Sequence, residues 1–390
     1  MDRRAFLSAS LTVGAALEAS EVLAQSYAPK SSAPSPAPAF PPPDARSVWL
    51  VGDTGPLTPA AYAARLAELT AGPDGADIRD GYLKGGAVEA LERAFAEFLG
   101  KEDCAFFPTG TLANNVALRV LCGDNHHAVC HHESHLYLDE SDASQRLSGL
   151  NLIPLGAGRP YVTAEETAAA IHEAENGPYP LKVGAITIES PVRRQHGGVV
   201  PFETVTAVAA LARTHGCGLH LDAARLMLAP PTLDLKRYVA PFDTVYASLY
   251  KFLDAPFGAV LAGSKARIET AREFRHLFGG LIYQGWPEAL VALDSLKTFP
   301  ERIARAHGAA AQLISTLTAS GKVQPAPAAD ASNIYGLKMS QTLAEAAFER
   351  GRLAGVRIAR WDPELGGISL WVNDTINRRP VDEYVKLFLG

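Results

Sequence analysis

The stretch TVYASLYKFLDAPFGAVLAGS, residues 244–264, places a lysine directly after an apolar run that is typical of a buried strand. A lysine is almost never fully buried unless it is paired or chemically used. The simplest interpretation is that Lys251 begins a surface loop and extends its ammonium group into water. The segments around this stretch decide between that interpretation and a functional one.

From about residue 48 onward, helical and strand patterns alternate along the chain. Helices are predicted over residues 87–100, 111–121, 163–177 and 203–216, and strands over residues 104–108, 183–189, 217–222 and 243–250. Thr163 and Glu166 form the pattern of a capping box at the start of one helix. Strands that are apolar throughout and separated by helices indicate an α/β fold, with a mainly parallel central sheet covered by helices.

The chain of 390 residues is long enough for one large domain and a smaller one. We predict a large domain over residues 47–290, where the helices and apolar strands alternate. After about residue 290 the apolar strands give way to helices and short mixed strands, which predicts a smaller α+β domain over residues 291–390.

The first residues form a separate segment. Arg3 and Arg4 precede an apolar run that is too short to span a membrane, and a small-residue cleavage pattern follows. Residues 1–24 therefore resemble a twin-arginine export signal, so the protein is expected in the periplasm; if the arginine pair is there by chance, it is expected in the cytoplasm. Seven of the 27 prolines lie between residues 29 and 43, which predicts a proline-rich linker over residues 25–46.

The composition excludes some classes of partner. The net charge is −6 and the basic residues are scattered, so neither nucleic acid nor stable insertion into a membrane after signal removal is expected. The cysteines show no metal or redox spacing, and we expect buried free thiols, although the periplasm allows a disulfide. These are Cys104, Cys122, Cys130 and Cys217.

Three functional side chains follow predicted strands. Glu189 comes after VGAITI, Asp222 after CGLHL, and Lys251 after TVYASLY. Ligands of open α/β sheets gather outside the carboxyl ends of the strands. We therefore expect these side chains to converge at one edge of the sheet, which weakens the surface-loop interpretation of Lys251.

A lysine and an aspartate at neighbouring strand ends suit pyridoxal 5′-phosphate. Lysine can bond covalently to the aldehyde of this cofactor, and a carboxylate opposite its ring nitrogen keeps that nitrogen protonated. An anion site is also needed, and FPTGTLANN supplies a strand, a turn with Gly110 and Thr111, and the first amides of a helix. Ser248, three residues before Lys251, is a further candidate ligand of the phosphate.

Three motifs in register, FPTGTLANNVAL, GLHLDAARL and SLYKFLDAPFGAVLAG, resemble the landmarks of the threonine aldolase and β-eliminating lyase family. The resemblance covers roughly residues 50–290. It implies the type I pyridoxal-phosphate fold of the aspartate aminotransferase superfamily and a homodimer or homotetramer. It also implies that Lys251 binds the cofactor covalently, that Asp222 pairs with its ring nitrogen, and that Arg225 lies near its phenolate oxygen. In HESHLYLDE, His135 matches the histidine that stacks on the cofactor. Tyr82 matches a tyrosine near the start of the large domain and is expected to bind the substrate.

The sequence departs from this family where the substrate carboxylate is held. The glycine-rich turn FGGLIYQGW has Tyr283 and Gln284 in place of an arginine, and GGISLWVND has Ser369 where an arginine is expected. The stretch SPVRRQHGGVV instead offers Arg193 and Arg194, and we expect that one of them, preferably Arg194, holds the substrate acid.

The family resemblance predicts an enzyme that acts on an amino acid. The favoured reaction is retro-aldol cleavage of a β-hydroxy amino acid to glycine and an aldehyde, with His135 or His196 as the base that takes the hydroxyl proton. The alternatives are β-elimination, in which Lys251 removes the α-proton, and a catalytically silent binding protein that retains the fold.

Two other motifs give weaker signals. Five of the eleven histidines lie between residues 126 and 135, but HESHL misses the helical zinc motif by one position, so no metal site is expected. GAGRPY lacks the third glycine of a dinucleotide fingerprint.

Overall fold

The computed structural model describes residues 40–71, 78–326 and 332–390. Residues 42–390 form one compact unit, and all elements below belong to it. The predicted export signal and nearly all of the proline-rich linker lie outside the described residues.

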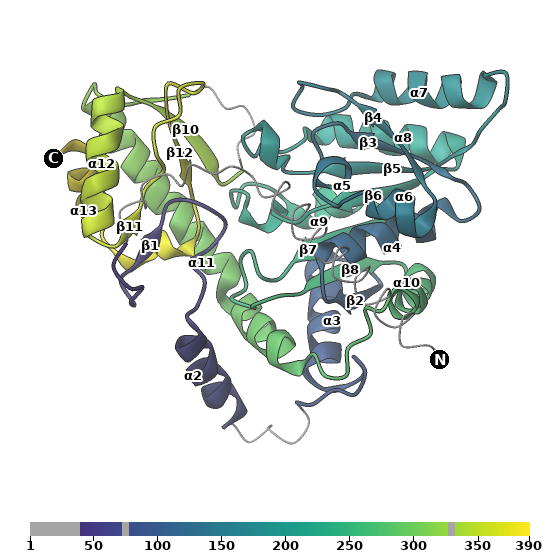
Figure 1. The fold of residues 1–390 in the computed structure, drawn as a ribbon, viewed down its shortest axis with the longest axis horizontal. Helices are drawn as coiled ribbons and strands as arrows, with labels where there is room; N and C mark the ends of the chain where they lie inside the picture. Colours follow the sequence, from purple (N-terminus) through teal and green to yellow (C-terminus); the bar gives the residue numbers. More distant parts are fainter. Residues whose placement is uncertain (1–39, 72–77, 327–331) are drawn as a thin grey trace, which may run out of the picture. The chain divides into compact units, whose positions relative to one another are not determined.

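A seven-stranded sheet forms the core of the part of the molecule that lies on the right in Figure 1. Its strands lie in the order β2-β8-β7-β6-β5-β3-β4. They are β2 (Asp103–Phe107), β3 (His127–His131), β4 (Asn151–Leu155), β5 (Val183–Glu189), β6 (Gly218–Asp222), β7 (Thr244–Ser248) and β8 (Ala259–Gly263). The five strands from β4 to β7 run parallel, and β8 is antiparallel to both β7 and β2. The predicted fold class, a mainly parallel sheet in an α/β fold, is confirmed.

Helices cover both faces of this sheet. They are α3 (Gly86–Leu99), α4 (Gly110–Cys122), α5 (His135–Leu138), α6 (Ala143–Ser148), α7 (Ala164–Asn176), α8 (Phe202–His215), α9 (Leu235–Val239) and α10 (Lys265–Leu277), with short 3-10 turns η1 (Arg193–Gln195) and η2 (Leu226–Leu228). The side chains of β2 show the two faces, because Cys104 and Phe106 join the core cluster that includes α3, whereas Ala105 and Phe107 join the cluster formed with α4 and α10. A strand buried on both faces therefore carries a continuous apolar run.

The predicted helix ends agree with the structure. Thr163 and Glu166 make both hydrogen bonds of a capping box at the start of α7. Gly100 ends α3 with φ of 65°, the left-handed conformation that glycine adopts at little cost. Local capping chemistry thus fixes where α7 begins and where α3 ends.

The C-terminal third of the chain forms a second group of helices and strands. The long helix α11 (Trp286–Ala319) is followed by β9 (Gln324–Pro325), β10 (Ile334–Lys338), α12 (Gln341–Leu353), β11 (Val356–Arg357), β12 (Gly367–Trp371), η3 (Asp374–Arg378) and α13 (Val381–Leu389). Strands β12, β10 and β9 form an antiparallel sheet, and β11 pairs with β1 (Val48–Trp49), which precedes α2 (Pro59–Thr70). The boundary predicted at residue 290 falls inside α11, and the division into two domains stays a prediction.

Helix α11 contacts both the helices around the seven-stranded sheet and the C-terminal elements. It contacts α3 of the first group and α13 and η3 of the second. Before its internal Pro300, Ser295 donates a hydrogen bond to Asp254 in the loop after β7 (2.9 Å). After Pro300, Arg302 forms an ion pair with Asp374 of η3, and His307 contacts the Tyr335 hydroxyl in β10 (3.2 Å).

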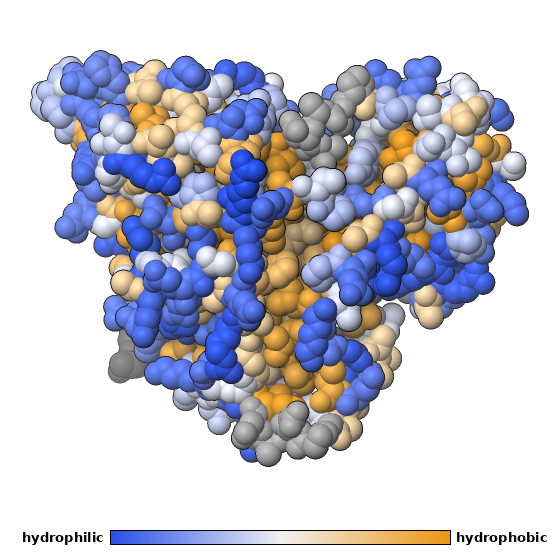
Figure 2. Space-filling view, turned by 180° about the vertical axis from the view of Figure 1, so that it is seen from behind, coloured by the Kyte–Doolittle hydropathy of each residue, from blue (hydrophilic) through white to orange (hydrophobic). Residues whose placement is uncertain are grey.

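The four cysteines are buried and none forms a disulfide, as expected for structural thiols. None of the described helices is both long enough and apolar enough to cross a membrane. Figure 2 shows one face of the molecule, on which hydrophobic residues form a band flanked by hydrophilic ones.

Candidate active site

The carboxyl ends of three adjacent strands bring the predicted side chains together. Strand β6 lies between β5 and β7, and Glu189 pairs directly with Asp222 in the parallel register. Lys251 follows β7 after two residues, so it reaches the same edge. The expected convergence of these three residues is present.

Lys251 is buried, with 7% of its surface exposed. Burial and the nearby Arg225 guanidinium lower the pKa of Lys251 to about 8. Its ammonium nitrogen lies 5.5 Å from the centre of the Tyr250 ring. The surface-loop interpretation is wrong, because the preceding strand carries this lysine into the protein instead of into water.

Asp222 is held by hydrogen bonds to both carboxylate oxygens. Asn114 Nδ2 donates to Oδ2 (2.9 Å), and the Ala224 amide donates to Oδ1 (3.0 Å). Asn114 Oδ1 in turn contacts His220 Nε2 (3.0 Å), and burial lowers the pKa of His220 to about 4. A neutral histidine and an amide therefore fix the orientation of this carboxylate.

His135 begins α5, at the same edge of the sheet. Its amide donates to Glu189 Oε2 (2.6 Å), and its Nδ1 lies 2.9 Å from Glu140 Oε1. The hydrogen bond to Glu140 raises the pKa of His135. Because the buried Glu140 carboxylate accepts from Nδ1, the Nε2 atom of a neutral ring is the one that can take up a proton.

Glu189 has a positioning role that its place at a strand end does not reveal. Its two oxygens accept from the backbone amides of His135 and Arg193. Burial, with the neighbouring Asp222 carboxylate, raises the pKa of Glu189 to about 7. Glu189 therefore links the start of α5, at His135, to the loop that carries Arg193 and Arg194.

The predicted anion site lies at the start of α4. Thr109 caps the helix through its side chain, and a Cβ atom added at Gly110 would lie only 2.1 Å from the Tyr246 hydroxyl. The absence of a side chain at Gly110 therefore makes room for the Tyr246 ring at the first turn of α4. The Ser248 hydroxyl is buried and completes no hydrogen bond within the described part of the chain, although the Tyr246 and Tyr250 hydroxyls lie nearby.

These features fit pyridoxal phosphate. The unpartnered Ser248 hydroxyl and the first amides of α4, at Gly110 and Thr111, supply donors for a phosphate group. Lys251 supplies the amine and Asp222 the oriented carboxylate. Arg225, predicted near the phenolate oxygen, is mostly buried and binds Asp53 through its Nε atom (2.8 Å).

The arginines proposed for the substrate acid lie next to this edge but are already paired. Arg193 Nη2 lies 3.1 Å from Asp139 Oδ2, and Arg194 Nη2 lies 2.7 Å from Asp139 Oδ1. A second bond joins Arg194 Nη1 to Asp139. Ser369 lies on β12 opposite Gly336, as expected for a strand position.

Two predicted residues are not joined to the Lys251 group by any contact among the residues that the structure describes. Tyr82 is 56% exposed, and its ring packs edge-on against Tyr283 at 5.2 Å. His196 is an exposed turn residue with φ of 55°. Their assigned roles stay predictions.

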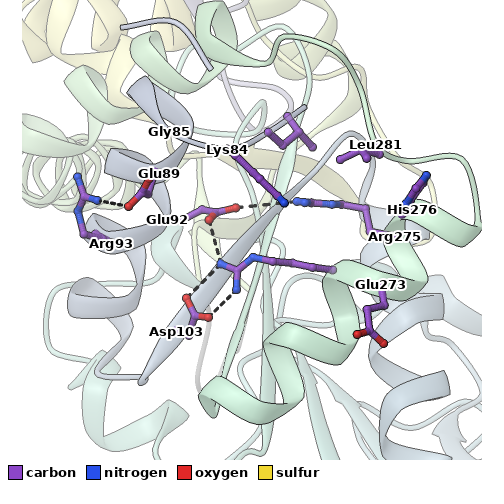
Figure 3. Close-up of a pocket in the computed structure, with 12 residues that line it drawn as sticks. Lys84, Gly85, Glu89, Glu92, Arg93, Asp103, Glu273, Arg275, His276 and Leu281 are labelled. Atoms are coloured by element: carbon purple, nitrogen blue, oxygen red, sulfur yellow. Dashed lines mark hydrogen bonds and ion pairs between the residues drawn. The ribbon is translucent and has the colours of Figure 1, made fainter. Parts of the chain in front are cut away.

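A separate surface cavity of about 590 Å³ lies between α3, the start of β2 and α10 (Figure 3). Its lining includes Glu92, Asp103, Arg272 and Arg275, but none of the predicted site residues. Arg272 bridges Glu92 (2.9 Å) and Asp103 (2.6 Å), so these charges compensate one another. We regard this group as structural.

Several residues of the site leave little or no signal in the sequence. Asn114, Glu140, Asp53 and Asp139 all contact predicted residues. Asn114 leaves one usable signal, because it and Asn115 place two amides among the small and apolar residues of a predicted helix. A buried amide needs hydrogen-bond partners.

The fold and site together define a pyridoxal-phosphate enzyme of fold type I. A serine palmitoyltransferase variant of S. paucimobilis, solved with a pyridoxal-phosphate ligand, shares this fold at 15% identity, with a TM-score of 0.64 over 88% of this chain and 86% of that chain. A Listeria monocytogenes structure named for L-allo-threonine aldolase gives a TM-score of 0.72 at 25% identity, over 88% and 95% of the two chains.

The family model of beta-eliminating lyases matches residues 50–340, and the chain belongs to this family. It is 26% identical over 320 residues to the low specificity L-threonine aldolase of Saccharomyces cerevisiae, which covers 81% of this chain and 79% of the yeast protein. The predicted family, enzyme class and cofactor are confirmed: the protein is a lyase that uses pyridoxal phosphate.

Proposed function

We propose that this protein cleaves a β-hydroxy-α-amino acid to glycine and an aldehyde, as the names of its relatives indicate for those proteins. The observation that carries the proposal is the meeting of Lys251, Asp222 and His135 at one edge of the sheet. This arrangement offers a covalent anchor, a partner for the ring nitrogen and a base within one site.

When bound, the cofactor supplies an electron sink that stabilises the carbanion left after a bond to the substrate Cα breaks. Lys251 would hold it covalently, and the low pKa of this lysine keeps a larger fraction of the amine neutral and nucleophilic than in an ordinary lysine. Asp222, oriented by Asn114, would keep a proton on the ring nitrogen.

His135 is the better placed of the two predicted bases. Glu140 holds its Nδ1 atom, which leaves Nε2 to accept the proton of the substrate hydroxyl. His196 is exposed and has no described partner that would orient its ring. We therefore assign the base to His135.

The reaction is tested by incubating purified holoenzyme with L-threonine and L-allo-threonine and identifying the products. Retro-aldol cleavage gives glycine and acetaldehyde. Because the family match is to beta-eliminating lyases, elimination is the second candidate. In that reaction Lys251 would remove the α-proton, and a keto acid and ammonia would appear instead. An absence of turnover with both substrates would contradict the proposal.

Arg194→Ala is expected to lower kcat/KM by roughly ten- to a hundredfold, because it removes a charged hydrogen bond to the substrate carboxylate. The measurement is steady-state kinetics with the cleaved amino acid. Arg213→Ala, at an exposed position of α8, is the matched control, and unchanged cofactor absorbance shows that the variant folds. Wild-type efficiency in both Arg193→Ala and Arg194→Ala would show that neither arginine holds the substrate carboxylate.

We also propose that the protein assembles as a dimer or tetramer. The apolar band in Figure 2 and the exposed pair of Tyr82 and Tyr283 support this proposal, because large exposed apolar patches often mark interfaces. A monomeric mass by sedimentation equilibrium would contradict it.

For the location we propose export to the periplasm, on the basis of the arginine pair at the start of the sequence. Replacing Arg3 and Arg4 by lysine is expected to trap the precursor in the cytoplasm, because the export pathway recognises paired arginines. Cell fractionation with an antibody against the protein measures the outcome. Normal periplasmic recovery of the double variant would show that the first residues have another role.

A further inference from the structure

Asp139 lies between the two arginines that could bind the substrate acid. It accepts two bonds from Arg194 and one from Arg193, so its two oxygens occupy the guanidinium edge that a substrate carboxylate would use. The hydrogen bond from Arg194 lowers the pKa of Asp139 to about 2, so this carboxylate stays charged at any working pH. All three side chains are partly exposed, which leaves room for an exchange of partners.

The position of this cluster is fixed relative to the site. Asp139 ends α5, and its amide donates to the carbonyl of His135 at the other end of that helix (2.8 Å). The Arg193 amide and the His135 amide each donate a hydrogen bond to the Glu189 carboxylate. The arginine pair and the proposed base are therefore anchored to the same buried group.

Resting on the function proposed above, we propose that Asp139 is a specificity-determining residue, an internal carboxylate that occupies the substrate-acid position on Arg194. An incoming amino acid must displace it. After the exchange Asp139 keeps its contact with Arg193, so the two guanidinium groups and the two carboxylates balance in charge. Substrates that lack a carboxylate have nothing to displace, and Asp139 does not weaken their binding.

The test compares the binding of two amines to the holoenzyme by isothermal titration calorimetry. Glycine and 2-aminoethanol both carry a primary amine, but only glycine carries a carboxylate. In Asp139→Asn the dissociation constant of glycine is expected to fall about three- to tenfold, because the competing charge is removed from a partly exposed ion pair. The dissociation constant of 2-aminoethanol is expected to stay unchanged.

Two further variants sharpen this experiment. Asp142→Asn is the matched control, because it removes the same charge three residues later at an exposed position with φ of 58°, which asparagine tolerates. It is expected to leave both constants unchanged. Adding Arg194→Ala to Asp139→Asn is expected to abolish the gain for glycine.

Several results would overturn the proposal. They are an unchanged or weaker affinity for glycine in Asp139→Asn, an equal gain for 2-aminoethanol, or no measurable binding of glycine to either protein. Weaker binding of glycine would mean that Asp139 orients the arginines and does not compete. These outcomes are separate from the product assay, because an enzyme that fails to release glycine and aldehyde can still show the gain.

Discussion

Lys251→Ala is expected to lose covalent attachment of the cofactor and to lower kcat on the order of a thousandfold or more, because no other group replaces the anchoring amine. Mass spectrometry after borohydride reduction measures the attachment: the wild-type mass should rise by that of the reduced cofactor, and the variant mass should not. Lys265→Ala, at the exposed start of α10, is the matched control and should keep the attachment.

The result for Lys251 is decisive because its surroundings are unlike those of the control. Lys251 is buried with a pKa lowered to about 8, and Tyr250 is the aromatic neighbour of its ammonium group. Reduction that labels a different lysine in the variant would contradict the assignment. A wild-type protein that takes up no pyridoxal phosphate would contradict the assignment of the whole site.

Asp222→Asn is expected to lower kcat on the order of a hundredfold, about 2.7 kcal/mol of the activation barrier. The amide keeps the shape of the side chain, but its single oxygen can accept from only one of the two donors, Asn114 or the Ala224 amide, and it cannot hold a proton on the ring nitrogen as a carboxylate does. Steady-state kinetics with the cleaved amino acid gives the loss. Asp234→Asn is the matched control, because asparagine caps α9 as well as aspartate does.

Lys251→Ala and Asp222→Asn distinguish covalent anchoring of the cofactor from protonation of its ring nitrogen. Asp222→Asn should retain the covalent attachment that Lys251→Ala loses, so reduction and mass spectrometry distinguish a misfolded variant from a chemically impaired one. Wild-type kcat in Asp222→Asn would show that the carboxylate does not face the ring nitrogen.

The sequence predicts the parts of this site that follow from strand ends. Asp222 and Lys251 stand directly after long apolar runs, and the parallel arrangement of those runs requires their ends to meet. Gly110 and Thr111 are predictable for a similar reason, because a strand, a small-residue turn and a helix start leave a local pattern. Periodicity and capping residues carry this information over short distances.

The rest of the site depends on contacts between segments that have no common pattern. Arg225 and Asp53 are 172 positions apart, and the sequence around one of them gives no indication of the other. Asp139 is a plain surface aspartate in the sequence, and only the structure shows that it binds Arg194. Glu189 was expected at the functional edge, yet the reason it matters is its bonds to two backbone amides, which side-chain patterns do not record.

Helix α11 has a mechanical consequence for the enzyme. Pro300 has no amide hydrogen, so the carbonyl of Leu296 lacks its helical partner. Arg302, two residues later, spans this gap: its Nη2 atom donates to the carbonyl (3.3 Å) and hydroxyl (2.6 Å) oxygens of Ser295, and its Nη1 atom pairs with Asp374 of η3. One guanidinium group therefore braces α11 across the missing hydrogen bond, and it links η3 to the loop after β7 through Ser295.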